Sequence, residues 1–175
     1  MTSTDVFDDL EAEQDALSAV LSSLPADAWL RESGAAGWTV ADVVLHLAQT
    51  EEAVVATAAA TLEPRRWERL GADVDTAMDA LVRAERTDPA TTFRRWETAR
   101  HAALAALRSA DPGRPLMWVA TRLKPRTLAT TRLAEHWAHA LDIVDPLGIE
   151  YPDTIRLRHI AWLGHSTLPY AFGLV

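Results

Sequence analysis

Apolar residues recur along most of this chain at the three- and four-residue spacing of amphipathic helices, whereas the two-residue alternation of strands is scarce. The first helical segment is expected from about Thr4 to Leu24, and Pro25 stops it. The second is expected from Val40 to about Leu62, with Pro64 as its end. Long helices therefore account for most of the first third of the chain.

The second segment begins with a capping signal. Thr39 stands directly before it, and Asp42 follows three residues later in the manner of a capping box. A hydroxyl and a carboxylate at this spacing each accept a backbone N–H bond at the start of a helix. We therefore expect the helix to begin at Val40.

The rest of the chain continues the helical pattern with one interruption. The further helices are expected at Val74 to Arg86, Thr92 to Ser109, Arg126 to Leu147 and Asp153 to Leu168. Leu116 to Leu123 lacks this spacing and is expected to be extended or irregular, with Trp118 as an anchor. Gly148 is a typical C-terminal helix stop. With no internal repeat or linker, the pattern predicts one all-α domain over residues 1–175, a four-helix bundle with extra short helices.

The charge balance argues against a nucleic-acid partner. Lys and Arg number 17 against 25 for Asp and Glu, whereas affinity for a phosphate backbone rests on clustered Lys and Arg. The chain has no apolar run of roughly 18 residues that would span a membrane, and its acidic start lacks the layout of a secretion signal. We expect a cytoplasmic protein that binds neither nucleic acid nor membrane.

Cysteine is absent from the sequence. Disulfides, cysteine metal ligands and a cysteine nucleophile are therefore excluded within this chain. Any thiol chemistry must use a thiol that a second molecule brings.

The segment from Arg132 to Asp142 carries the most informative polar residues. Glu135 and His139 are four residues apart, so their side chains meet on one helix face. Arg132 and Asp142, three residues to either side, extend the same stripe. The stripe is expected to lie opposite an apolar, core-facing side made of Leu133, Trp137, Ala140, Leu141 and Val144.

An imidazole and a carboxylate together suit a borderline divalent ion such as zinc or nickel. Two ligands from one helix rarely suffice, and His46 in the middle of the second helix is the best candidate for a third. Three protein ligands leave one coordination position open, which is typical of a catalytic rather than a structural site. The candidate metal ligands and catalytic residues are thus His46, Glu135 and His139.

Other interpretations of the same residues stay open at this point. A polar stripe on a helix is common on protein surfaces, and a lone His46 is more often a hydrogen-bonded histidine than a ligand. His136 also lies three residues from His139, but it borders the apolar side and is expected to pack or to form a hydrogen bond. The three other histidines have no partner pattern, and they are His101, His159 and His165.

Two segments resemble a known family. Gly37 to Leu47, with Asp42 and His46, resembles the second-helix motif of the metal-binding domain of mycothiol-dependent maleylpyruvate isomerases. The Arg132, Glu135, His139 and Asp142 pattern resembles the second metal motif of the same family. The resemblance implies a DinB-like four-helix bundle with up-down-down-up topology. It also implies that the motif residues His46, Glu135 and His139 are the metal ligands.

The resemblance implies a metal-dependent enzyme that activates a low-molecular-weight thiol, such as mycothiol, as a cosubstrate. The thiolate would attack a small electrophilic substrate, which is then transferred or isomerised. Asp142 or Arg132 would orient a ligand, and Arg132 would alternatively pair with Glu135 or with a substrate carboxylate. The closing stretch, Leu157 to Phe172, is similar to an actinobacterial branch of metal-binding proteins.

Two further interpretations use the same bundle. The His/Glu/His set could activate water, or act as general acid and base without a metal. A non-catalytic metal or small-molecule binding module is the other. Trp and Leu side chains on the last helix would also allow a homodimer.

Overall fold

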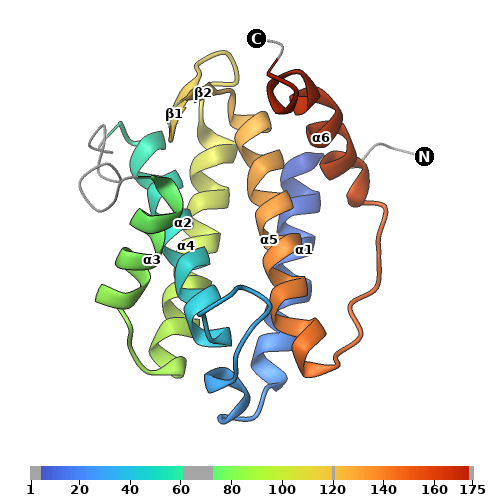
Figure 1. Cartoon of the computed structure of the whole chain (residues 1–175). Coiled ribbons are helices and arrows are strands. Elements are labelled where there is room, and N and C mark those ends of the chain that lie inside the picture. The colour runs from blue at the N-terminus through green and yellow to red at the C-terminus, as the bar shows by residue number, and fades with distance from the viewer. Residues whose placement is uncertain (1–4, 61–72, 120, 174–175) are drawn as a thin grey trace.

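The computed structural model describes residues 5–60, 73–119 and 121–173, most of which are helical. Four long helices form the body of the molecule (Figure 1). They are α1 (Val6–Ser23), α2 (Val40–Ala58), α4 (Pro89–Ser109) and α5 (Pro125–Leu147). The shorter elements are η1 (Ala28–Leu30), α3 (Val74–Ala84), β1 (Leu116–Trp118), β2 (Thr121–Leu123) and α6 (Leu157–Ala171).

The order and direction of the long helices define the topology. α1 and α5 run in one direction, and α2 and α4 run in the opposite one (Figure 1). α2 packs along α4, and α1 packs along α5. This is the up-down-down-up arrangement of a DinB-like bundle, so the expected all-α fold class is confirmed. None of the described helices combines the length and apolar character that a bilayer span requires.

Local capping explains where the helices begin. Thr39 and Asp42 form the predicted capping box, in which the Asp42 carboxylate accepts the Thr39 N–H at 2.9 Å. α4 begins at Pro89, three residues before the predicted Thr92. The reason is that Asp88 caps the helix by accepting the Thr91 N–H at 3.0 Å, and proline suits the first turn.

The observed bounds of some helices differ from the expected ones. Gly148 ends α5 in the left-handed conformation, with φ of 67°, as predicted. The expected end of the second helix, at Leu62 and Pro64, lies outside the described residues, and α2 as described ends at Ala58. α6 begins at Leu157 rather than Asp153, because a turn in which the Leu157 N–H bonds the Thr154 carbonyl precedes it.

Two clusters of buried apolar residues fill the bundle. One includes Leu17, Val44, Trp96 and Ile143. The other includes Leu10, Val54, Leu107 and Leu128. Each of the four long helices contributes to both clusters, and each such side chain stabilises the fold by roughly 2 kcal/mol. The four helices are therefore held around one shared interior.

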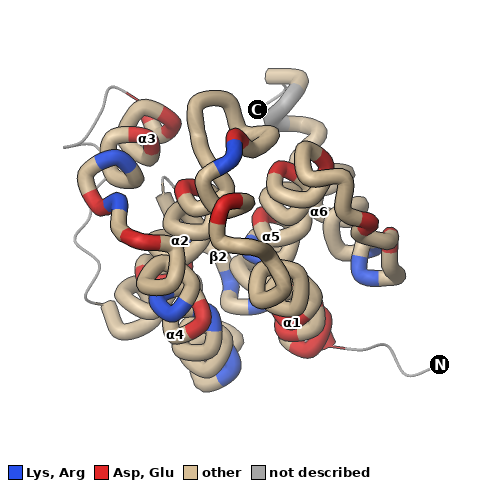
Figure 2. Tube along the Cα trace, turned by 90° about the horizontal axis from the view of Figure 1, so that it is seen from below, with Lys and Arg blue, Asp and Glu red and all other residues tan. Residues whose placement is uncertain are grey.

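Arginines of α4 also tie this helix to its neighbours. Arg95 pairs with Glu52 of α2 at 2.7 Å, and Arg100 pairs with Asp15 of α1 at 2.8 Å. Figure 2 accordingly shows basic and acidic residues side by side along α4.

The polar stripe of α5 was expected to lie opposite the core, and this was wrong for Arg132. Its side chain is only 2% exposed, while Trp137 and Leu141 on the supposed core side are half-buried. The reason is that α5 packs against α1 on one side and against α2 and α4 on the other. Arg132 is therefore buried against Glu51 of α2, whereas Glu135 of the same stripe remains 46% exposed.

Candidate metal centre

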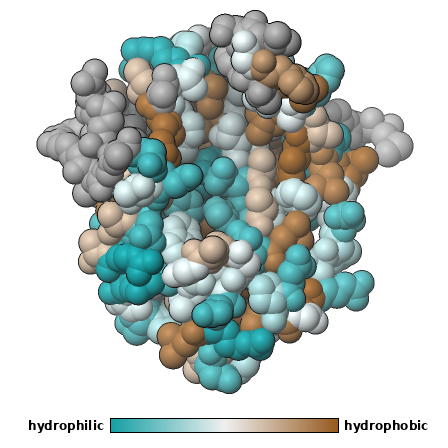
Figure 3. Space-filling model, viewed as in Figure 1, coloured by the Kyte–Doolittle hydropathy of each residue, from teal (hydrophilic) through white to brown (hydrophobic). Residues whose placement is uncertain are grey.

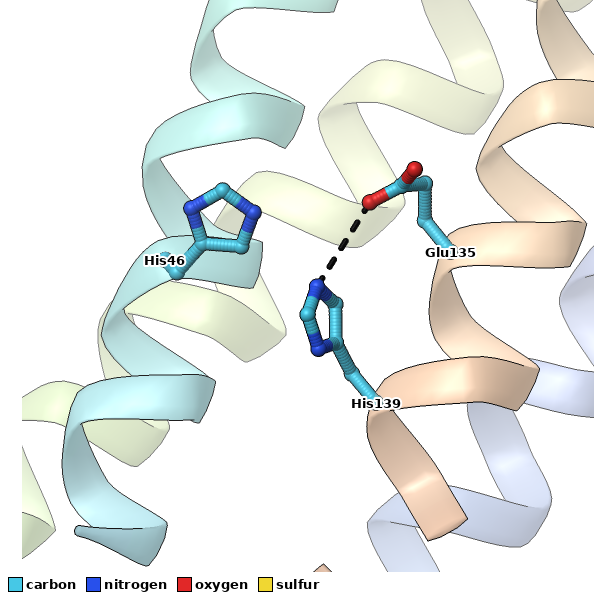
Figure 4. Close-up of side chains that lie close together, drawn as sticks. All are labelled: His46, Glu135 and His139. Carbon is cyan, nitrogen blue, oxygen red and sulfur yellow. Dashed lines mark ion pairs between the residues drawn. The ribbon is translucent and has the colours of Figure 1, made fainter. Parts of the chain in front are cut away.

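His46 of α2 meets Glu135 and His139 of α5 in the space between the two helices. The three side chains point toward one another (Figure 4). Each offers one ligand atom, and these atoms all lie within 4.8 Å of one another. The structure thus brings together the three residues that the sequence nominated.

Each helix positions its residues for a simple reason. Glu135 and His139 lie one turn apart on α5, and Oε2 of Glu135 is 3.5 Å from Nε2 of His139. His46 lies in the middle of α2, and its ring centre is 5.1 Å from that of His139. Because the pair and the third residue sit on facing helices, the packing of α2 against α5 sets the size of the site.

The site opens to solvent on one side through a small cavity. His46 is 8% exposed and the His139 side chain 18%, but the Glu135 side chain is 46% exposed. The cavity, of about 140 Å³, is lined by His46, Thr50, Val74, Met78, Trp118, Val119, Thr131, Arg132 and Glu135. Figure 3 shows hydrophilic residues gathered at the centre of this face of the molecule. A small molecule can therefore reach the Glu135 side of the site.

The surroundings keep two of the three groups in the form that a metal requires. Burial, together with the charges of His139 and Arg132, lowers the pKa of His46 to about 3, so the ring is neutral at neutral pH. The contact with His139 lowers the pKa of Glu135 to about 2 against the effect of burial, so the carboxylate is ionised. A neutral imidazole and a carboxylate are both competent ligands.

Asp142 orients the ring of His139, the third candidate ligand. Its Oδ2 lies 2.9 Å from Nδ1 of His139. Burial alone would lower the pKa of His139, but its contacts with Glu135 and Asp142 outweigh burial and raise it. Because a carboxylate only accepts hydrogen bonds, Nδ1 of His139 carries a proton and Nε2 faces Glu135. Carboxylates orient metal-bound histidines in this way.

The donor set fits a borderline dication. It offers two ring nitrogens and one carboxylate oxygen, which suits zinc or nickel. Nδ1 of His46 is buried without a hydrogen-bond partner in the described part of the chain, and Figure 4 shows the other ring nitrogen turned toward Glu135. Three converging donors with an open side leave room for a further ligand.

Arg132 lies beneath the site and is not paired with Glu135. Its Nε donates to Glu51 at 2.9 Å and its Nη2 donates to Thr50 at 2.7 Å. The guanidinium also lies 5.6 Å from the centre of the Trp118 ring. Nη1 makes no hydrogen bond to any described residue, and Arg132 lines the cavity. Nη1 of Arg132 can therefore donate to an anionic group that binds in the cavity.

Sequence reasoning missed Glu51, which is fully buried. Burial raises the pKa of its carboxyl, while the charge of Arg132 opposes that effect. The sequence did contain a sign of this, because Glu51 lies in a helix that carries apolar residues on most of its faces. A carboxylate buried in such a helix needs a charged or hydrogen-bonding partner.

His136 is a core residue, and the expectation that it packs and forms hydrogen bonds is confirmed. It is 0% exposed. Its Nδ1 lies 2.8 Å from the Arg132 carbonyl, and its Nε2 accepts from the Trp96 indole at 3.3 Å. Burial lowers its pKa to about 3. Both nitrogens are engaged away from the cavity, so His136 does not compete with Glu135 as a ligand.

The remaining histidines lie elsewhere. His101 is exposed and bonds the Glu97 carbonyl, and His165 is exposed. His159 has a partner that its spacing did not reveal, because Asp9 of α1 accepts from it at 2.8 Å.

Comparisons with known proteins agree with these motifs. A sequence model described as the mycothiol maleylpyruvate isomerase N-terminal domain matches residues 10–144, which include His46, Glu135 and His139. Two uncharacterized proteins of Mycobacterium tuberculosis, from two strains, are 38% identical to this chain over 168 residues. Those matches cover 94% of this chain but only 65% of either relative, so the chain spans about two thirds of their length.

Solved structures agree on the fold. The crystal structure of a mycothiol-dependent maleylpyruvate isomerase superposes with a TM-score of 0.63, and that of a mutant form with 0.65. Each is 14% identical in sequence and covers 79% of this chain and 59% of the isomerase chain. At this identity the likeness establishes the architecture alone.

Proposed function

This chain belongs to the family of mycothiol maleylpyruvate isomerase N-terminal domains, and from that premise we propose that it binds a divalent metal ion and activates a low-molecular-weight thiol. The ligands would be His46, Glu135 and His139. The observation that carries the proposal is the convergence of their three ligand atoms within 4.8 Å, from two helices distant in sequence.

A bound dication would supply one property, the acidity that keeps a coordinated thiol deprotonated at neutral pH. The thiol must arrive with a second molecule because the chain contains no cysteine. Mycothiol is the thiol that the names of the family and of the solved structures contain. We therefore propose a mycothiol-like cosubstrate, and zinc or nickel as the ion.

The protein's own groups would prepare the site. His46 is neutral and Glu135 ionised at neutral pH, so neither must change protonation to bind a cation. Asp142 would hold the His139 ring in place through Nδ1. Nη1 of Arg132 would bind an anionic part of the substrate in the cavity.

The reaction we propose begins with attack of the thiolate on a conjugated double bond. A sulfur–carbon bond forms and the electron pair moves to the conjugated carbonyl. Rotation about the new single bond, followed by loss of the thiolate, returns the cosubstrate and leaves an isomer. If a proton quenches the carbanion first, the thiol is transferred to the electrophile.

A second candidate is acid–base catalysis without a metal, which the His139–Asp142 pair supports. A histidine held by a carboxylate can accept and return a proton. Activity that persists after exhaustive chelation would favour this candidate. A chain that binds metal but leaves thiols and electrophiles unchanged would instead be a binding module.

The metal assignment is tested by elemental analysis of purified protein beside His46→Ala and His139→Ala. We expect close to one ion per chain in the parent and a loss of metal in both variants. His101→Ala is the matched control because this histidine is exposed and does not line the cavity. Metal content unchanged in either site variant would exclude this ligand set.

The thiol assignment is tested with cobalt-loaded protein. Mycothiol should produce a sulfur-to-cobalt charge-transfer absorption in the parent and none in His46→Ala. A loaded protein that shows no such band, and that does not speed thiol addition to maleylpyruvate, would rule out thiol activation.

A further inference from the structure

We propose that the loop of residues 33–38 positions the metal centre, acting on His139 through Gly34 and Asp142 and on His46 through Trp38. This inference rests on the proposed metal site and goes beyond it, because it assigns a role to residues that supply no ligand. The loop lies between η1 and α2, and its two ends reach the two helices that carry the site.

The first observation concerns a backbone carbonyl of α5. In a helix, the carbonyl of one residue accepts the N–H of the residue four positions later. The residue four positions after Asp142 is Pro146, which has no N–H and lies inside α5. The Asp142 carbonyl therefore lacks its helical donor. Gly34 supplies one, since its N–H donates to that carbonyl at 2.7 Å.

The second observation is the closeness of this contact. A Cβ atom built on Gly34 would lie 2.9 Å from Oδ1 of Asp142 and 3.1 Å from its Cα. The φ of Gly34 lies outside the left-handed region, so the reason for a glycine here is the close contact and not the backbone conformation. The other carboxylate oxygen of Asp142 holds Nδ1 of His139 at 2.9 Å. A side chain at position 34 would push against the group that orients His139.

The third observation concerns the other end of the loop. The Trp38 ring centre lies 5.1 Å from that of His46, and the Trp38 indole N–H donates to Asp79 of α3 at 2.9 Å. Ser33 closes the loop on itself, because its N–H and its hydroxyl both donate to the Trp38 carbonyl, at 2.9 and 2.8 Å. The closed loop therefore links Asp142 on α5 to His46 on α2.

The physical consequence is a fixed separation between ligands on different helices. A metal ion binds tightly only where its donors are already placed, and groups that orient a ligand commonly contribute about 10- to 100-fold in affinity. A proline in α5 thus creates the docking point by which a distant loop aligns His139 with His46.

The decisive variant is Gly34→Ala, with Gly164→Ala as the control because nothing lies within 4 Å of a Cβ at Gly164. We expect Gly34→Ala to raise the Kd for Co²⁺ about tenfold and to change the cobalt absorption spectrum. Gly164→Ala should change neither. A folded Gly34→Ala protein with parental Kd and spectrum would overturn the proposal.

Two further variants test the route of the effect. In the double variant of Gly34→Ala with Asp142→Ala the closest contact, with the Asp142 carboxylate, is absent, although the contact with the Asp142 Cα at 3.1 Å stays. The two changes should therefore raise the Kd by less than the product of their separate effects. Pro146→Ala returns an N–H to α5 that competes with Gly34 for the Asp142 carbonyl, and it should also raise the Kd. If Gly34→Ala does not fold, the Kd of Pro146→Ala decides whether the loop positions His139. If the effects of Gly34→Ala and Asp142→Ala on the Kd are additive in free energy, or if Pro146→Ala keeps the parental Kd, the loop does not position His139.

A readout without metal separates this inference from the proposed function. NMR of the metal-free protein should show the His139 Nδ1 proton signal shifted in Gly34→Ala and unchanged in Gly164→Ala. If the parent binds no metal but Gly34→Ala shows this shift, the metal site is excluded while the positioning of His139 by the loop is supported. A parent that binds metal, with no shift and no change in Kd in Gly34→Ala, would exclude only the role of the loop.

Discussion

The Asp142 carboxylate lies 2.9 Å from Nδ1 of His139, on the side of the ring away from Glu135. Asp142 thereby determines which ring nitrogen of His139 faces the cavity. It supplies no atom to the group of three converging donors. Its role is therefore separable by experiment from that of the ligands.

Replacing Asp142 with asparagine should weaken metal binding by about 10- to 100-fold without abolishing it. The amide presents either an acceptor or a donor to Nδ1, and it carries no charge. Competition with a coloured chelator measures the change. Asp145→Asn is the control, since Asp145 is exposed on the same helix, and an equal loss of affinity in both variants would contradict the role of Asp142.

Replacing Glu51 with alanine should lower the free energy of unfolding by about 3–5 kcal/mol, because it leaves the charge of Arg132 buried without its partner. Urea denaturation measures the change. The neighbouring Glu52 pairs with Arg95 at a more exposed position, and Glu52→Ala should cost only about 0–1 kcal/mol. Equal losses in the two variants would mean that Arg132 finds another partner.

His136→Gln should keep the metal content of the parent while lowering its stability. His136 lies in the core against Gln14 and Trp96, so the change costs about 1–3 kcal/mol of unfolding free energy through lost hydrogen bonds and packing. Metal analysis and thermal melting together make the test. Loss of metal from a folded His136→Gln protein would contradict the assignment of His136 to the core alone.

The capping box should make stability depend on pH in acid. Burial raises the pKa of Asp42, but hydrogen bonds from Arg86 and Thr39 outweigh it and hold the pKa below the ordinary 3.8. The carboxylate therefore stabilises the fold above about pH 3.8, and this contribution disappears as the pH falls through the lowered pKa.

Asp42→Asn is the corresponding variant. It should be about 1 kcal/mol less stable than the parent at pH 7, and the difference should shrink on acidification. Denaturant titrations of both proteins at several pH values measure this. A difference that stays constant down to acid would show that the charge of Asp42 contributes nothing.

Much of the architecture could be predicted from the sequence because it rests on local interactions. Helical periodicity predicted the four long helices, and Thr39, Asp42 and Gly148 marked helix ends through bonds that span a few residues. The four-residue spacing placed Glu135 beside His139 for the same reason. His46 was chosen as the third ligand for its place in the middle of the second helix, and the resemblance to the family supported that choice. Spacing along the chain did not show that the two helices would meet at this point.

The tertiary structure alone decided how groups distant in the chain meet. Arg132 was expected beside Glu135 on an outward stripe, but it is buried against Glu51, which is 81 residues away. The contact of Gly34 with Asp142 likewise had no signature, although Pro146 had already removed the helical donor. Spacing along one helix determines which side chains share a face, whereas the packing of the helices determines what that face meets.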